Sequence, residues 1–208
     1  MTRRIDTSEL GNVLVVKRKV LRSFKCLCEF SRDIGMLPAI MDNALFMSRR
    51  LIEEDTSYKQ LIPYVVLTHN KRVLTYIRHE GVEPRLQGMV SFGFGGHVTE
   101  KDVIKGSFAD TNTLWNAAKR EIKEETGISL RESNEPFALI NEDRTAVGRV
   151  HLGIVYLIDM ARTADEQSLT DECTDFKLMP VANVHATKKL EPWSKILAKN
   201  IVSACLLH

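Results

Sequence analysis

REIKEETGI, at residues 120–128, carries the most informative pattern in this chain, and the rest of the sequence is best interpreted outward from it. The stretch ends a predicted helix over residues 113–126. Asn112 or Thr113 would cap the start of that helix, because side chains of this kind accept hydrogen bonds from its first free N–H groups. Gly127 would end it, since glycine adopts left-handed backbone at little cost.

The acidic end of this helix conflicts with its surroundings. Glu121 and Glu125 continue the apolar row that starts at Leu114, and such a row normally faces protein. Like charges at these spacings cost about 0.2–0.5 kcal/mol per pair, and the C-terminal end of a helix also disfavours anions. A divalent cation would offset these costs. Carboxylate and backbone oxygens suit Mg²⁺ or Mn²⁺ and do not suit zinc.

A glycine-rich segment, SFGFGGH at residues 91–97, precedes the helix. Its glycines weaken a regular strand and indicate backbone that must approach another group closely. Phe92 and Phe94 would share one face of the sheet, where core packing is the simplest role for them, as it is for Tyr64 and Tyr76.

The remaining pattern predicts a mixed α+β fold. Residues 1–60 are expected to form an N-terminal appendage packed on a core of residues 61–208. Within the appendage, residues 41–54 favour a helix, and Arg49 and Arg50 are expected on its solvated face. Strands are expected at residues 13–16, 62–68, 72–78, 137–141, 149–160 and 176–179, a polar loop at 99–111, and a last helix from Pro192 to about 207.

Composition narrows the classes of function. The 208 residues include 29 Lys and Arg against 27 Asp and Glu, a net charge of +2, which argues against a charge-driven nucleic-acid binder. The sequence shows neither an apolar run of about 18 residues nor a secretory signal, so we expect no membrane association. The four cysteines are scattered, which is typical of reduced thiols in a cytoplasmic protein.

Residues 120–128 resemble the second half of the Nudix box, G-x5-E-x7-R-E-U-x-E-E-x-G-U, where U is aliphatic, at all seven fixed positions. The first half departs from it. The glutamate of the box falls on Asn112 and its glycine on Gly106, whereas the double glycine of the family resembles Gly95-Gly96, about ten residues further from the helix. Residues 85–97 also resemble a branch of the family described only as uncharacterised phosphoesterases.

The resemblance implies a fold, a reaction and a set of metal ligands. The fold would be a Nudix-like α/β/α sandwich around a mixed sheet. The reaction would be metal-dependent hydrolysis of a phosphoanhydride in a nucleoside diphosphate linked to another group, with Mg²⁺ or Mn²⁺ delivering the attacking water. The metal ligands would be Glu121, Glu124 and Glu125, with a backbone carbonyl of Gly95 or Gly96.

Other residues would complete such a site. Arg120 would orient the glutamates through a salt bridge, and the general base would be one of the helix glutamates or, second, Glu142. Phosphate contacts would fall to Arg78, Arg85 and His97. The partner is then a small nucleotide-type molecule, and a homodimer is an assembly that the sequence leaves open.

Two alternatives share the fold. A Nudix-fold module that senses or binds a nucleotide without cutting it is favoured by Asn112 and opposed by the three helix glutamates. An enzyme similar to isopentenyl-diphosphate isomerase would need a cysteine near the glycine-rich strand, and residues 91–97 contain none.

Overall fold

The computed structural model describes residues 11–22, 29–78, 86–131, 135–162 and 176–206. Its strands are β1 (Asn12–Lys17), β2 (Phe30–Ser31), β3 (Ala44–Ser48), β4 (Tyr58–His69), β5 (Arg72–Ile77), β6 (Val90–Ser91), β7 (Phe94–Gly95), β8 (Ala138–Ile140), β9 (His151–Asp159) and β10 (Phe176–Pro180). Its helices are α1 (Arg18–Arg22), α2 (Leu37–Asp42), α3 (Arg49–Ile52), α4 (Thr111–Thr126), α5 (Ala146–Val150), α6 (Val181–Val184) and α7 (Pro192–Leu206), with short 3-10 turns η3 (Glu100–Asp102) and η4 (Met160–Arg162).

The described strands form one mixed sheet. Its main path runs β10-β5-β4-β9-β8-β2, and β1, β3, β6 and β7 attach to the side of that path. The long strands β4 and β9 run parallel in its centre, from the pair Gln60–His151 to the pair Thr68–Asp159. Most other pairings are antiparallel, including β4 with β7, which places Gly95 beside Tyr64.

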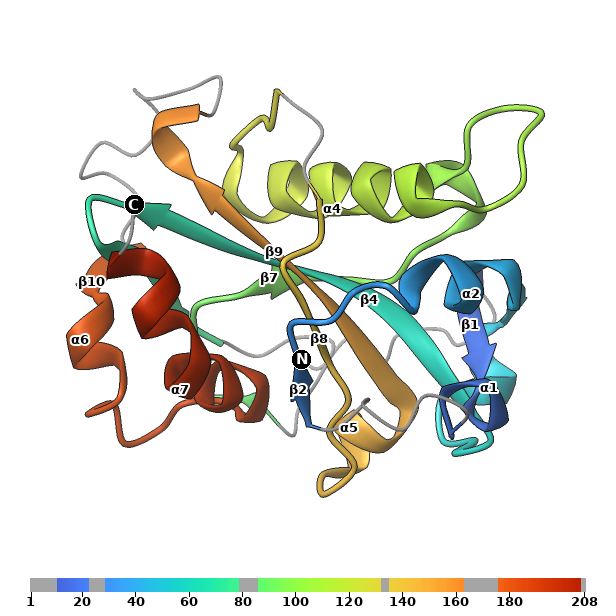
Figure 1. Ribbon diagram of the computed structural model, residues 1–208, viewed down its shortest axis with the longest axis horizontal. Helices are drawn as coiled ribbons and strands as arrows, with labels where there is room; N and C mark the ends of the chain where they lie inside the picture. Colours follow the sequence, from blue (N-terminus) through green and yellow to red (C-terminus); the bar gives the residue numbers. More distant parts are fainter. Residues whose placement is uncertain (1–10, 23–28, 79–85, 132–134, 163–175, 207–208) are drawn as a thin grey trace, which may run out of the picture.

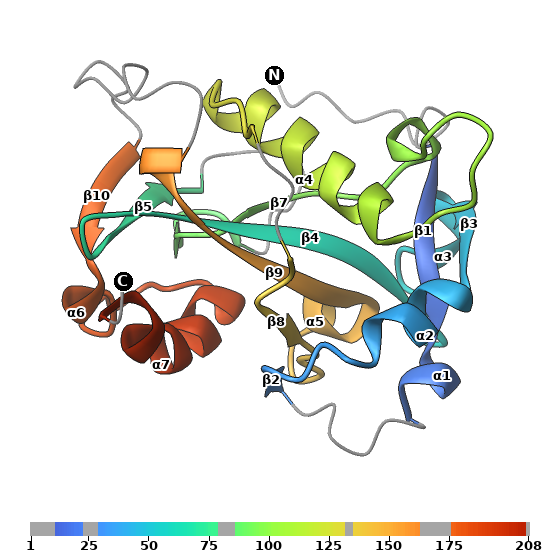
Figure 2. The same cartoon turned by 45° about the horizontal axis from the view of Figure 1, so that its top comes forward.

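Helices cover both faces of the sheet. Figures 1 and 2 show α4 on one face and α6 with α7 on the other. Alternate residues of β4 divide between these layers, because successive side chains of a strand point to opposite faces. Leu61 and Val65 pack in the cluster that contains α4, whereas Ile62 and Val66 pack in the cluster that contains α7. The α/β/α sandwich that the resemblance implied is therefore confirmed.

Helix α4 begins two residues before the predicted start. Asp110 caps it, because its carboxylate accepts the backbone N–H of Thr113 at 2.9 Å. Gly127 ends the helix with φ +76°, in the left-handed region, as predicted. The expected loop at 99–111 contains the 3-10 turn η3.

The predicted helix over residues 41–54 is wrong. Helix α2 ends at Asp42, and residues 44–48 form β3, which pairs antiparallel with β1 from Ala44–Val16 to Ser48–Asn12. Backbone pairing with β1 therefore outweighs the helical spacing of the apolar residues, as tertiary contacts often do.

The N-terminal segment joins the main sheet directly. Strand β1 pairs with the start of β4, with Val15 opposite Gln60, and Leu14 and Ile40 pack in the same cluster as Leu114 of α4. A division of the chain at residue 60 stays a proposal. No helix in the described part of the chain has the length and apolar character needed to cross a membrane.

Candidate active site

Helix α4 and the glycine-rich segment border a cavity of about 730 Å³. Glu121 and Glu125 line it from α4, and Gly95, Gly96 and His97 line it from the other side. The N-terminal segment contributes five residues to the remaining lining (Gly11, Asn12, Val13, Arg49 and Glu53). The strands β4, β5, β7 and β10 and the loops beside them contribute Ile62, Tyr64, Tyr76, Ile77, Arg78, Leu86, Phe94, Thr99 and Phe176. The rest comes from residues 145–151 and from the start of α7 (Thr145, Val147, His151, Glu191, Pro192 and Trp193).

Gly96 allows the Glu121 carboxylate to lie against the backbone. A Cβ on Gly96 would fall 2.2–2.4 Å from the three carboxyl atoms of Glu121, so the carboxylate would have to leave this position. Burial raises the pKa of Glu121, although the neighbouring Arg120 opposes the shift. The glycine-rich segment predicted that another group comes close to its backbone, and at Gly96 that group is the Glu121 carboxylate.

Arg120 holds this region together through hydrogen bonds to three acids and one carbonyl. Its Nε and Nη2 donate to the two oxygens of Asp102 at 2.8 and 2.9 Å, and Nη2 also donates to the His97 carbonyl at 2.9 Å. Its Nη1 donates to Glu121 at 2.6 Å and to Glu124 at 3.3 Å. The predicted salt bridge from Arg120 to the glutamates is present. Asp102 fixes the guanidinium through Nε and Nη2, which leaves Nη1 for the glutamates.

Asp102 is nearly fully buried, and burial alone would favour its neutral form. Hydrogen bonds from Arg120 and Thr99 outweigh this penalty and lower the pKa of the carboxyl. Sequence reasoning missed Asp102. The available signal was the Thr99-x-x-Asp102 spacing of a capping box, which the structure contains.

Glu125 lies at the exposed rim of the same cavity. The surrounding protein still removes enough water from its carboxylate to raise the pKa to about 7, and the Glu121 charge adds to the shift. Arg78, which also lines the cavity, opposes it. Glu124 does not line the cavity, and its side chain is 59% exposed.

His97 and His151 form a pair in the cavity wall, with ring centroids 5.6 Å apart. The Nε2 atom of His97 is buried and makes no hydrogen bond within the described ranges. Burial, followed by the Arg49 charge, lowers the pKa of the His97 imidazole well below its usual value. The imidazole of His97 is thus favoured in its neutral form in the cavity wall. Arg85, the third predicted phosphate contact, lies outside the described residues.

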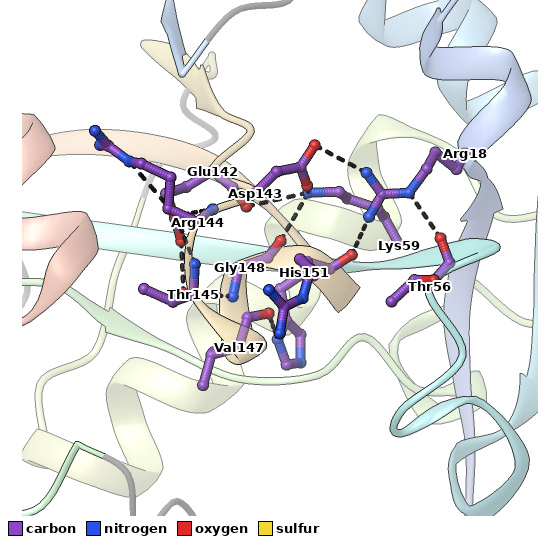
Figure 3. Close-up of polar contacts among 11 residues, drawn as sticks. Arg18, Thr56, Lys59, Glu142, Asp143, Arg144, Thr145, Val147, Gly148 and His151 are labelled. Carbon is purple, nitrogen blue, oxygen red and sulfur yellow. Dashed lines mark hydrogen bonds and ion pairs between the residues drawn. The ribbon is translucent and has the colours of Figure 1, made fainter.

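Glu142 is buried and does not line the cavity. Its carboxylate accepts hydrogen bonds from the backbone N–H groups of Arg144 and Thr145 and from the Thr145 hydroxyl (Figure 3). A Cβ on Gly148 would clash with it. Glu142 therefore organises the turn before α5, and we do not retain it as a general base.

The turn that Glu142 organises is anchored by the fully buried Lys59 of β4. The Lys59 ammonium donates to the carbonyls of Glu142 at 3.3 Å and Gly148 at 2.7 Å, and it pairs with Asp143 at 2.8 Å (Figure 3). Arg18 holds the other oxygen of Asp143 at 2.8 Å. This turn leads into Thr145, Val147 and His151 of the cavity wall.

Lys59→Met should lower the free energy of unfolding by about 2 kcal/mol or more, because it removes two hydrogen bonds and one ion pair of a buried ammonium and leaves buried carbonyls unpaired. Urea unfolding would measure the change. Lys17→Met, at an exposed position of the neighbouring β1, is the matched control and should stay within about 0.5 kcal/mol. Equal stability of the two variants would contradict an anchoring role for Lys59.

Comparison with known proteins now assigns the chain to a family. The family model of the NUDIX domain matches residues 62–201, which is more than half of the chain. The chain belongs to the Nudix family. It is also 33% identical over 189 residues to Protein YmaB of Bacillus subtilis strain 168, across 88% of this chain and 90% of that protein.

A solved structure agrees with this assignment. Tm1382, described as a candidate Nudix hydrolase, superimposes with a TM-score of 0.73 at 31% identity, across 93% of this chain and 100% of that one. The family and this neighbour support hydrolysis as the general class of activity.

The structure shows where this Nudix member departs from the box. Asn112 is exposed in the first turn of α4, where it donates to Asp110 at 2.9 Å, and it does not line the cavity. Gly106 has φ +84° and lies in the loop before the helix. The double glycine beside Glu121 is Gly95-Gly96. The loss of the box glutamate therefore leaves the cavity carboxylates in place.

The donor set at Glu121 fits a hard divalent cation. The Glu121 carboxylate lies against Gly96, and Glu125 lines the same cavity. Burial raises the pKa of both carboxyls, and carboxylate and backbone oxygens are the donors that Mg²⁺ and Mn²⁺ prefer. Among the described residues, no group of three or more His, Cys, Asp or Glu side chains could hold a metal ion alone. This agrees with Mg²⁺ sites, which commonly use one or two carboxylates and complete the shell with substrate phosphates and water.

Proposed function

We propose that this Nudix protein hydrolyses a phosphoanhydride in a small nucleotide-type substrate and that it requires Mg²⁺ or Mn²⁺. One observation carries the proposal: Glu121 and Glu125 of α4 line a single cavity with Gly95 and Gly96. The surrounding protein raises the pKa values of both carboxyls, so their charged forms cost free energy without a cation. A cytoplasmic location is part of the proposal and is supported by the scattered cysteines alone.

The chain would supply binding and orientation. Glu121 and Glu125 would hold the cation, with a backbone carbonyl of Gly95 or Gly96. When bound, such an ion neutralises phosphate charge and lowers the pKa of water. Arg120, fixed by Asp102, would keep Glu121 in place, and Arg78 would contact a phosphate oxygen of the substrate.

The two helix carboxylates are also the candidates for accepting a proton from the attacking water. Both line the cavity, whereas Glu142 does not. The aromatic side chains that line the cavity, Tyr76, Phe176 and Trp193, would offer apolar surface for the rest of the substrate.

A product screen tests the proposal. Nucleoside diphosphate sugars, dinucleoside polyphosphates, NADH, ADP-ribose, coenzyme A and oxidised dNTPs would each be incubated with Mg²⁺ and with Mn²⁺. We expect turnover of at least one class. Excess EDTA should abolish turnover, and re-addition of the cation should restore it. Without a cation, the cavity carboxylates repel the anionic substrate and no metal ion neutralises its phosphate charge there. Tight nucleotide binding with no product under either cation would instead favour the non-catalytic sensing module.

A further inference from the structure

The N-terminal segment contributes a cation to the cavity. Arg49 and Glu53 line the same cavity as Glu121 and Glu125, although both precede the part of the chain that matches the Nudix model. The pairing of β3 with β1 brings Arg49 there, and its backbone N–H donates to the Gly11 carbonyl at 3.2 Å. Figure 2 shows β1, β3 and α3 together at one end of the sheet. The expectation of a solvated face is therefore wrong for Arg49.

The Arg49 side chain is largely buried, and only some of its hydrogen-bond donors have partners. Its side chain is 16% exposed, and it binds the Glu53 carboxylate through Nε at 2.9 Å and Nη2 at 3.5 Å. In the part of the chain that the structure describes, its Nη1 makes no hydrogen bond. Its charge also acts on His97, which lies next to Gly96. Arg49 thus has a free donor in the cavity that the acidic pair also lines.

We propose that Arg49 forms an anion-binding subsite and donates hydrogen bonds to a phosphate oxygen of the substrate; this rests on the proposed hydrolase function. A guanidinium matches phosphate geometry, and its planar donors can bind two oxygens at once. Arg78 lines the cavity from the residue directly after β5, so the two arginines reach the cavity from different parts of the fold. A diphosphate would then meet cationic donors from the N-terminal segment as well as from the core.

The competing interpretation is a purely structural Arg49–Glu53 pair, four residues apart, that stabilises α3. The two interpretations predict opposite results for Glu53. If the pair is structural, loss of either partner should have the same effect. If Arg49 binds the anion, Glu53 competes with that anion for the guanidinium, so its removal should preserve or strengthen binding.

Titration calorimetry with imidodiphosphate and Mg²⁺ would measure binding without turnover. Arg49→Met should weaken binding by about tenfold or more, because it removes charged hydrogen bonds. Arg49→Lys, which keeps the charge, should lie between Arg49→Met and the wild type. Arg50→Met is the matched control, since Arg50 is the exposed neighbour on α3 and does not line the cavity, and it should bind like the wild type. Glu53→Gln should bind as tightly as the wild type or more tightly.

Two outcomes would overturn the subsite. One is unchanged imidodiphosphate binding in an Arg49→Met protein that melts like the wild type. The other is a Glu53→Gln protein that loses binding as Arg49→Met does. Both results leave the hydrolase proposal intact if the wild type still cleaves its substrate. Failure of the proposed function looks different, because the wild type would then release no product from any compound in the screen.

Discussion

Glu121→Gln and Glu125→Gln should each lower kcat by about a thousandfold while the protein keeps its fold. Glutamine has the size of glutamate but no charge, so each variant removes one of the two anionic groups that line the cavity from α4. Burial raises the pKa values of both acids, and the Glu121 charge adds to the shift at Glu125, so the charged form of each acid costs free energy in the folded protein. Loss of one charge should therefore leave thermal stability equal or higher.

Neighbouring positions of the same helix provide the controls. Glu124→Gln should reduce kcat by less than about tenfold, because its side chain is 59% exposed and reaches Arg120 only at 3.3 Å. Lys123→Gln, on the exposed face, should leave turnover unchanged. Initial rates at saturating Mg²⁺ or Mn²⁺ and melting temperatures would be measured for all four variants. Unaltered turnover by Glu125→Gln would remove the acidic pair from the mechanism.

The position of the acidic pair was predictable because it depends on local spacing. Glu121 and Glu125 follow the same helical row as the fully buried Leu114, and both line the cavity, although Glu125 lies at its exposed rim. The end of the helix at Gly127 was predictable for a similar reason, because a glycine after the last helical residue adopts the left-handed backbone at little cost. Glu124 lies off this row, and its side chain is 59% exposed and does not line the cavity, although the sequence grouped it with the other two glutamates as a metal ligand.

The supporting residues depend on contacts between distant parts of the chain. Asp102 is 18 positions from Arg120, and nothing in the local pattern pairs them. Arg49 reaches the cavity only because β3 pairs with β1, whereas the apolar spacing of residues 41–54 favoured a helix. Glu142 also depends on contacts that the sequence does not show. The sequence offered it as a second candidate for the general base, and the structure shows that its carboxylate accepts two hydrogen bonds from Thr145 in its own turn.

Gly96→Ala should reduce activity by about a hundredfold or more with little loss of stability, whereas Gly95→Ala should destabilise the fold. The added methyl at Gly96 would meet the Glu121 carboxylate at 2.2–2.4 Å, and that carboxylate is the far end of a flexible side chain that can move away. At Gly95 the methyl would meet the Pro63 carbonyl of β4 at 2.4 Å, where sheet backbone cannot shift easily. The glycines are adjacent and the substitution is the same, but only one of the clashes involves a proposed metal ligand.

Each variant would be measured for its free energy of unfolding in urea and for kcat against Mg²⁺ or Mn²⁺ concentration. Gly96→Ala should require a higher cation concentration for half-maximal activity, since a displaced Glu121 holds the ion less well. Gly95→Ala should lose about 1–3 kcal/mol of stability, as overpacked sites commonly do. If Gly96→Ala kept full activity and cation affinity, contact between the Glu121 carboxylate and the double glycine would have no part in catalysis, and the metal site would have to be sought elsewhere in the cavity.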